Sequence, residues 1–327
     1  MRSRSKRVVG FLVVLLVLVG GLVVAVQRDQ GTLPVAQPLS GAKAPSPAGL
    51  ATPVAGLAVY VLSTGEIQIP AAAMIDPAHP LARADEKGGK IWVPNFAYLI
   101  VHPTRGAVLV DTGLGAAFAT RSNGDLGWFT QPAVHTRVQP GADVASQLRK
   151  LGISAPAFVV LTHGHIDHTG GLQDVFAAYG PVDVVVGEGE PDAINAMLSI
   201  RKGFKPLHFE GARHLFTTHI DRTSTSSFTS GIDLLGDGSV LLYDTHGHTP
   251  GHLAVLVNLA GGPALMVGDA VQTPHALKDG IPSGNCTDPV AALAVARELR
   301  ALQGQEPRLR VLYGHHRGEP ALLDVLH

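Results

Sequence analysis

The chain has 327 residues, of which 46% are hydrophobic, and its formal net charge at pH 7 is −1. This length and apolar content predict a globular protein with an ample core, and the near-neutral charge excludes the broad basic surface of a nucleic-acid-binding protein. A single cysteine, Cys286, excludes both a disulfide framework and a thiolate metal site within the chain. Any metal must therefore be held by histidine and carboxylate side chains.

The amino-terminal residues have the pattern of a membrane segment. Four basic side chains within residues 2–7 precede residues 8–26, which are all apolar or glycine. A helix of that length spans roughly 28 Å, close to a bilayer core of about 30 Å. We therefore predict a transmembrane signal anchor over residues 1–28, with the rest of the chain held outside the cytoplasm. A cleaved secretory signal, which would leave a secreted protein, is the alternative.

Residues 29–56 are rich in proline and glycine and poor in large apolar side chains. This composition is typical of a linker. We expect it to connect the membrane segment to one folded domain over residues 57–327.

From residue 57 onward, short apolar runs alternate with helical periodicity, which predicts an α/β domain. The predicted strands cover residues 57–62, 96–101, 107–110, 158–161, 182–186, 234–237, 240–243, 253–257, 264–267 and 309–312. The predicted helices cover residues 144–151, 172–178 and 289–302. Residues 188–230 are the least regular, and we expect them to form a cap that shapes a substrate pocket. The histidines of this segment are predicted to be surface or packing residues: His208, His214 and His219.

A cluster of chemistry-bearing side chains directly follows the predicted strand 158–161: His163, His165, Asp167 and His168. Gathering these groups at a strand end is costly unless a cation binds them, and a zinc-type cation prefers such ligands. His163 and His165 are two residues apart in extended chain and so point to the same side, whereas Asp167 and His168 lie in the following turn. The spacing therefore favours two metal ions over one.

This run resembles the His-x-His-x-Asp-His signature of the metallo-β-lactamase superfamily. Four further segments resemble motifs of that family, in the family's order: residues 108–113, 247–252, 267–269 and 313–315. The resemblance implies a four-layer αββα sandwich with a dinuclear metal site at one edge.

The resemblance also implies seven ligands for two zinc ions: His163, His165 and His248 for one ion, Asp167, His168 and His315 for the other, and Asp269 as the bridge. Other divalent metals fit the same ligand types. Two neighbours could take a ligand's place, His246 that of His248 and His316 that of His315. Asp111 is implied to lie behind the site and to orient the ligand loop.

The predicted chemistry is hydrolysis, because two zinc ions can hold a bridging hydroxide at neutral pH. The resemblance implies that this hydroxide attacks a carbonyl, with Asp167 and Asp269 as the catalytic carboxylates. The motifs are most similar to those of the N-acyl-homoserine lactonase branch, so the expected substrate is a small lactone or another carboxylic ester. Gln272 stands where those lactonases commonly have a tyrosine that assists at the carbonyl.

Two alternatives stay open. A phosphodiester hydrolase uses the same metals, but few basic residues lie near the motifs, the nearest in sequence being Lys278 and Arg317. A non-enzymatic metal-binding surface protein on a retained fold is the other alternative. The sequence does not predict the oligomeric state.

Overall fold

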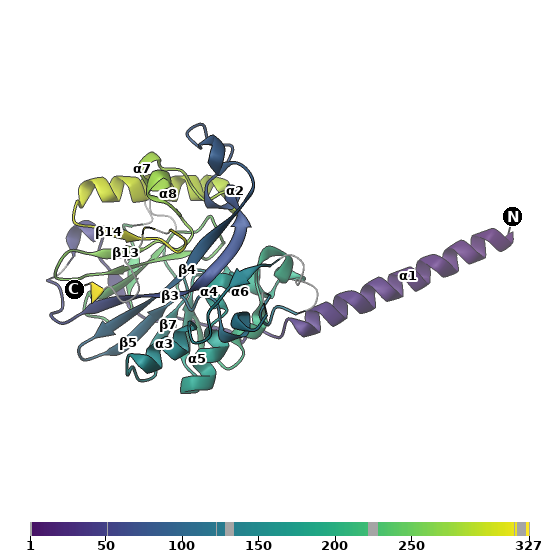
Figure 1. Ribbon diagram of the computed structural model, residues 1–327, viewed down its shortest axis with the longest axis horizontal. Coiled ribbons are helices and arrows are strands. Elements are labelled where there is room, and N and C mark those ends of the chain that lie inside the picture. Colours follow the sequence, from purple (N-terminus) through teal and green to yellow (C-terminus); the bar gives the residue numbers. More distant parts are fainter. Residues whose placement is uncertain are drawn as a thin grey trace.

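The computed structural model describes residues 2–50, 52–121, 123–127, 134–221, 228–316, 318 and 325–326. Two mixed β-sheets pack face to face, and helices cover their outer faces (Figure 1). The predicted α/β class is confirmed, and the layers lie in the predicted order of helices, sheet, sheet and helices.

The larger sheet is parallel at one side and antiparallel at the other. In spatial order its main path contains β1 (Ala36–Pro38), β9 (Leu215–Thr217), β8 (Asp183–Val186), β7 (Phe158–Val160), β5 (Gly106–Val110), β4 (Lys90–His102), β3 (Ala58–Pro70) and β15 (Val325–Leu326). Off this path, β6 (Thr136–Arg137) pairs with β3. The pairs from β1 to β5 are parallel and those from β5 to β15 are antiparallel. The parallel strands bring their carboxyl ends to one edge, where ligands are usually bound.

The smaller sheet contains, in spatial order, β14 (Arg310–Leu312), β13 (Ala264–Met266), β12 (Leu253–Val257), β11 (Val240–Asp244), β10 (Gly231–Asp233) and β2 (Ala42–Ala44). Only β13 and β14 are parallel among these pairs, so the residues after both strands emerge at the same end. The strand predicted at 234–237 is wrong. The Asp233 carboxylate accepts the N–H groups of Gly236 and Gly238 at 2.9 and 2.7 Å, which makes this segment a turn.

α1 (Arg2–Asp29) projects away from the sheets (Figure 1). The other helices lie mostly on the outer faces of the sheets: α2 (Ala71–Met74), α3 (Val144–Lys150), α4 (Ile166–Thr169), α5 (Leu172–Tyr179), α6 (Glu190–Asn195), α7 (Pro274–Asp279) and α8 (Pro289–Gln305). Short 3₁₀ turns cover Pro47–Gly49, Ala84–Glu86, Ala116–Ala119, Ser199–Lys202 and Pro206–Phe209. The side chains of Asp143, Thr273 and Asp288 accept backbone N–H groups at the starts of α3, α7 and α8. These caps satisfy donors that a helix leaves free in its first turn.

Three clusters of buried apolar side chains fill the spaces between the layers. One lies between α7, α8 and the smaller sheet and includes Leu277 and Leu299. A second lies between the two sheets, and a third lies between the larger sheet and α3 and α5, where Leu148 is buried. Full burial of one such side chain stabilises the folded state by about 1.5–3 kcal/mol. The strand ends that carry the metal-site residues are therefore held by buried apolar side chains on both faces of each sheet.

The structure has one helix over residues 2–29, where the transmembrane span was predicted. α1 occupies this region, but in the described part of the chain no helix combines the length and the apolar character needed to cross a bilayer. The last turn of α1 packs on the domain, where Val26 is buried and the Gln27 Oε1 atom accepts the Leu198 N–H at 3.1 Å.

Residues 29–56 are not a detached linker as predicted. β1 extends the parallel side of the larger sheet, and β2 extends the edge of the smaller sheet. The Tyr243 hydroxyl also donates to the Pro45 carbonyl at 2.5 Å. Extended chain of this composition can satisfy the free backbone groups of an edge strand, and proline is tolerated there. The folded domain therefore starts before residue 57.

Candidate metal centre

The seven predicted ligands converge at one edge of the two sheets. They lie in the loops after β7, between β11 and β12, after β13 and after β14. They form two groups, one of His163, His165, His248 and Asp269, and another of Asp167, His168 and His315. Within each group, one ligand atom from every residue lies within 4.8 Å of the others. The structure thus brings together every residue that the motifs predicted as a ligand.

Asp269 lies between the two groups and offers one oxygen to each. Its Oδ2 atom is 3.4 Å from His248 Nε2 and 3.9 Å from His163 Nε2. Its Oδ1 atom is 3.5 Å from His168 Nε2 and 3.4 Å from His315 Nε2. Oδ1 is buried without a hydrogen-bond partner among the described residues. A carboxylate so placed is suited to bridge two cations.

The nitrogen atoms of the first group converge in a way that suits a cation. His165 Nδ1 lies 2.9 Å from His163 Nε2 and 3.1 Å from His248 Nε2, so one ring nitrogen faces two others. Burial lowers the pKa of all three histidines, and that of His163 and His248 falls well below the ordinary value. Neutral imidazole is the form that binds metal, and one proton on His165 Nδ1 cannot satisfy both neighbours. The residues present therefore fit a divalent metal ion.

The second group is oriented by hydrogen bonds on the far side of its rings. His315 Nδ1 donates to the Pro94 carbonyl at 2.8 Å, and His168 Nδ1 lies 2.8 Å from Asp111 Oδ2. Burial alone would lower the pKa of His168, but the carboxylates of Asp111 and Asp269 raise it well above the ordinary value. A divalent cation would take the place of that proton, because metal binding requires the unprotonated ring.

Asp111 lies behind the site, where the resemblance placed it. Its Oδ1 accepts the Thr162 N–H at 2.7 Å, and its Oδ2 accepts the Thr162 hydroxyl at 2.8 Å as well as facing His168. Its backbone has a φ of 58°, a left-handed conformation that costs a non-glycine residue on the order of 1–3 kcal/mol. The three contacts hold the strained residue in place and fix the start of the ligand loop.

Sequence reasoning missed three residues that position the ligands. His252 Nε2 accepts the Asp269 N–H at 3.1 Å, and burial lowers the pKa of His252 to about 3, so the ring stays neutral. The Ser283 hydroxyl lies 3.0 Å from His248 Nδ1. Glu190 accepts the N–H groups of two ligand loops through its two oxygens. Of these three residues, only His252 could have been found from the sequence, because it is the last residue of the 247–252 motif.

Other candidate residues do not join the metal groups. His246 Nδ1 lies 2.5 Å from Asp244 Oδ1, and His316 packs against the ring of Tyr313 at 5.7 Å. Neither therefore takes a ligand's place. Burial raises the pKa of the Cys286 thiol to about 11, which keeps it protonated at neutral pH.

The three histidines of residues 188–230 are surface or packing residues, as predicted. His208 is buried with its Nδ1 at 2.7 Å from Thr169 Oγ1. His214 and His219 lie beside carboxylates at the surface, at 2.9 Å from Asp183 and 3.2 Å from Glu188.

A cavity of about 610 Å³ opens beside the ligands and is the candidate substrate pocket. Ile67 and Ile69 form part of an apolar wall, and Arg201 and Lys202 from the predicted cap also line it. Gln272 lines it too, and its amide donates to Asp269 Oδ2 at 3.1 Å. Residues 222–227 of the predicted cap lie outside the described residues.

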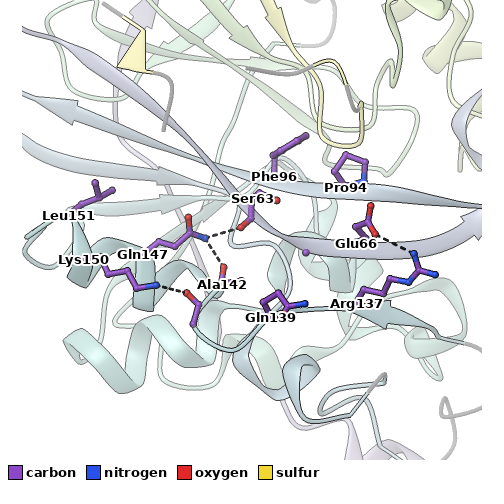
Figure 2. Close-up of a pocket in the computed structure, with 12 residues that line it drawn as sticks. Ser63, Glu66, Pro94, Phe96, Arg137, Gln139, Ala142, Gln147, Lys150 and Leu151 are labelled. Carbon is purple, nitrogen blue, oxygen red and sulfur yellow. Dashed lines mark hydrogen bonds and ion pairs between the residues drawn. The ribbon is translucent and has the colours of Figure 1, made fainter. Parts of the chain in front are cut away.

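A second cavity, of about 800 Å³, lies between β3, β6 and α3 (Figure 2). Its charged side chains and the Gln147 amide already have partners: Arg137 pairs with Glu66 at 3.6 Å, Lys150 donates to the Gly141 carbonyl, and the Gln147 amide donates to two backbone carbonyls. None of the seven ligands lines this cavity. We therefore place the active site at the smaller one.

We expect chelation to destabilise the protein strongly. A ligand present at a thousandfold excess over its dissociation constant adds about 4 kcal/mol to folding stability. For a chain of this size, each kcal/mol shifts Tm by about 2 °C, so EDTA should lower Tm by roughly 8 °C. Calorimetry with EDTA, followed by zinc in excess, measures the loss and its recovery. A metal-loaded sample whose Tm does not change on chelation would contradict a metal site within the core.

Comparison with known proteins gives consistent matches. The family model of the metallo-beta-lactamase superfamily matches residues 91–315. N-acyl homoserine lactonase AttM of Azorhizobium caulinodans is 27% identical over 269 residues, 79% of this chain and 92% of the relative. A probable metallo-hydrolase of Mycobacterium tuberculosis is 30% identical over 234 residues, 69% of this chain and 72% of the relative.

The solved structures agree on the fold. An N-acyl homoserine lactone hydrolase with the product N-hexanoyl-L-homoserine bound at its catalytic metal centre matches with a TM-score of 0.60 and 19% identity. The match covers 79% of this chain and 92% of that structure. A quorum-quenching N-acyl homoserine lactone hydrolase matches with a TM-score of 0.62 and 18% identity, over 83% of this chain and 96% of that structure.

Proposed function

The chain belongs to the metallo-beta-lactamase superfamily, and on that premise we propose that it hydrolyses a lactone or another carboxylic ester with two zinc ions. It is a metal-dependent hydrolase of lactonase-like type. The observation that carries the proposal is Asp269, whose two oxygens face two separate groups of ligands. A carboxylate in this position supports two ions side by side rather than one.

Two zinc ions, when bound, would supply water of lowered pKa and a Lewis acid for the substrate carbonyl. The side chains of this chain do the positioning. Asp111 and the Pro94 carbonyl fix the ring orientation of His168 and His315, so that Nε2 of each ring faces the site. The Gln272 amide lies in the cavity beside Asp269 and is a hydrogen-bond donor close to the reacting centre.

An acyl substrate is supported by the relatives and by the cavity wall. The AttM relatives are named N-acyl homoserine lactonases, and a matched solved structure holds N-hexanoyl-L-homoserine at its metal centre. Ile67, Ile69 and Ala73 line the cavity of this chain. An apolar wall of this kind suits an acyl chain, because pockets for small molecules are mostly apolar with a few polar groups for orientation.

A phosphodiester is the second candidate, and one observation favours it. The sequence has few basic residues near the motifs, which disfavoured a phosphate. Lys278 does not line the cavity, and Arg317 lies outside the described residues, but Arg201 and Lys202 do line it. The cavity therefore does contain basic side chains, contrary to the prediction, and two of them beside the metal site would suit an anionic phosphate.

We expect the zinc-loaded protein to hydrolyse a lactone or an aryl ester with a kcat/KM at least about tenfold above that for bis-aryl phosphate, a difference of about 1.4 kcal/mol in barrier. The panel should contain one lactone, one aryl ester, one thioester and one bis-aryl phosphate. An Asp269→Asn preparation, purified in parallel, controls for contaminating hydrolases. A preference for the phosphate would overturn the acyl substrate, and no turnover at full metal occupancy would favour a non-enzymatic metal-binding protein.

A further inference from the structure

The 3₁₀ turn Ser199–Lys202 is fixed against the first ligand loop. The Ile166 N–H donates to the Gly203 carbonyl at 2.8 Å, and the ring of Phe204 lies 4.8 Å from the ring of His165. At Gly203 the φ is 89°, and a Cβ there would lie 3.2 Å from the His165 ring. On the other side of the turn, Leu198 donates its N–H to Gln27. The turn therefore keeps a set position relative to the metal ligands.

Arg201 and Lys202 extend from this turn and line the same cavity as the ligands Asp167 and Asp269. They are the only lysine and arginine side chains among the described residues of that lining. Both are exposed, and neither has a hydrogen-bond or ion-pair partner in the described part of the chain. Their charges are therefore available to a ligand in the cavity.

Arg201 and Lys202 add positive charge to the cavity that the metal-site carboxylates Asp167 and Asp269 also line. Two divalent ions carry more positive charge than the carboxylates of Asp167 and Asp269 neutralise, and like charges in one cavity repel each other. An anionic group on a bound substrate would remove this repulsion. The apolar wall of Ile67 and Ile69 would meanwhile take the uncharged part of such a substrate.

We propose that Arg201 and Lys202 recognise an anionic group on the substrate, a carboxylate or a phosphate, that lies away from the bond being hydrolysed. The preferred substrate is then an ester or lactone that carries a negative charge. This inference rests on the proposed function for the bond that is cleaved, but the recognition of the anion is separate from it.

Two esters of equal acyl length test the proposal: para-nitrophenyl pentanoate, which is neutral, and mono-para-nitrophenyl glutarate, which ends in a carboxylate. We expect the zinc-loaded protein to favour the glutarate ester by roughly three- to thirtyfold in kcat/KM, as two partly exposed ion pairs would give. The Arg201→Met/Lys202→Met variant should bring this ratio close to one, and added salt should reduce it in the wild type. Because the ratio is taken within one preparation, partial misfolding does not change it.

A matched control removes one lysine and one arginine elsewhere. Lys278 and Arg300 are exposed on α7 and α8 and do not line the cavity. The Lys278→Met/Arg300→Met variant should keep the wild-type ratio. A ratio near one in the wild type, or an equal change in both double variants, would overturn the proposal.

Binding measurements keep the inference testable if no ester is hydrolysed. Calorimetry of the zinc-loaded protein with pentanoate, glutarate and 4-phosphonobutanoate compares three acids that differ in their far end. Glutarate binding more tightly than pentanoate supports recognition of a carboxylate, and 4-phosphonobutanoate binding more tightly supports recognition of a phosphate. In either case the Arg201→Met/Lys202→Met variant should lose the difference. Equal binding of all three acids overturns the inference, whereas absent turnover with selective binding overturns only the proposed function.

Discussion

Asp269→Asn is expected to lose at least one of the two metal ions and to lower kcat/KM by about 10³-fold or more. The carboxylate has one oxygen 3.4 Å from His248 and the other 3.4 Å from His315, and an asparagine would keep a single neutral oxygen. One of the two groups would then lack its anionic ligand. A metal ion supplies several kcal/mol of transition-state stabilisation, and about 4 kcal/mol corresponds to 10³ in rate.

Metal content by mass spectrometry and kcat/KM on the preferred substrate measure the two effects. Asp233→Asn is the matched control, because Asp233 is another buried carboxylate that accepts two backbone N–H groups, in the turn after β10. This control should keep both ions. A folded Asp269→Asn protein with two ions per chain and wild-type kcat/KM would refute the bridging role.

Apolar runs located nine of the strands but not β1, β2, β6, β9, β10 or β15, and they did not give the full length of β3. The first run ends at residue 62, whereas β3 continues to Pro70 in register with β4. A bulge between Ser63 and Gly65 interrupts the alternation of side chains, and beyond it polar and apolar residues alternate as an antiparallel ladder allows. A strand of this kind has no continuous apolar run, so its second half was not recognised.

The residues of the two His/Asp groups could be predicted from the sequence because they lie in short motifs at strand ends. The residues that position these side chains could not be predicted, because they are distant from the motifs in sequence. Glu190 is 26 residues from Gly164 and 61 residues from Gly251, and contacts both. Arg201 and Lys202 likewise reach the cavity only through the packing of their turn against the ligand loop. Such contacts depend on tertiary structure, which a local pattern does not encode.

Glu190→Gln is expected to weaken metal binding by about 10- to 100-fold and to lower stability by about 1–3 kcal/mol. The buried carboxylate accepts the Gly164 N–H at 2.7 Å through Oε1 and the Gly251 N–H at 2.9 Å through Oε2. Glutamine offers only one oxygen, so its NH₂ group would face one of these N–H groups and leave it unsatisfied. The change would loosen the loop of His163 and His165 from the loop of His248.

The stoichiometry separates this positioning role from simple destabilisation. A change that only lowered stability would reduce Tm and leave the metal affinity of the folded protein unchanged. Glu190 instead joins the two loops that supply the histidines of the first group, so the first ion should be lost at a chelator concentration that leaves the second bound. Competition with a chromophoric chelator measures the affinity of each ion. Glu210→Gln is the control, because Glu210 is an exposed glutamate outside both loops that accepts the Thr32 N–H at 2.8 Å. If Glu190→Gln gives up both ions together, at the wild-type chelator concentration, the carboxylate stabilises the fold without positioning the ligands.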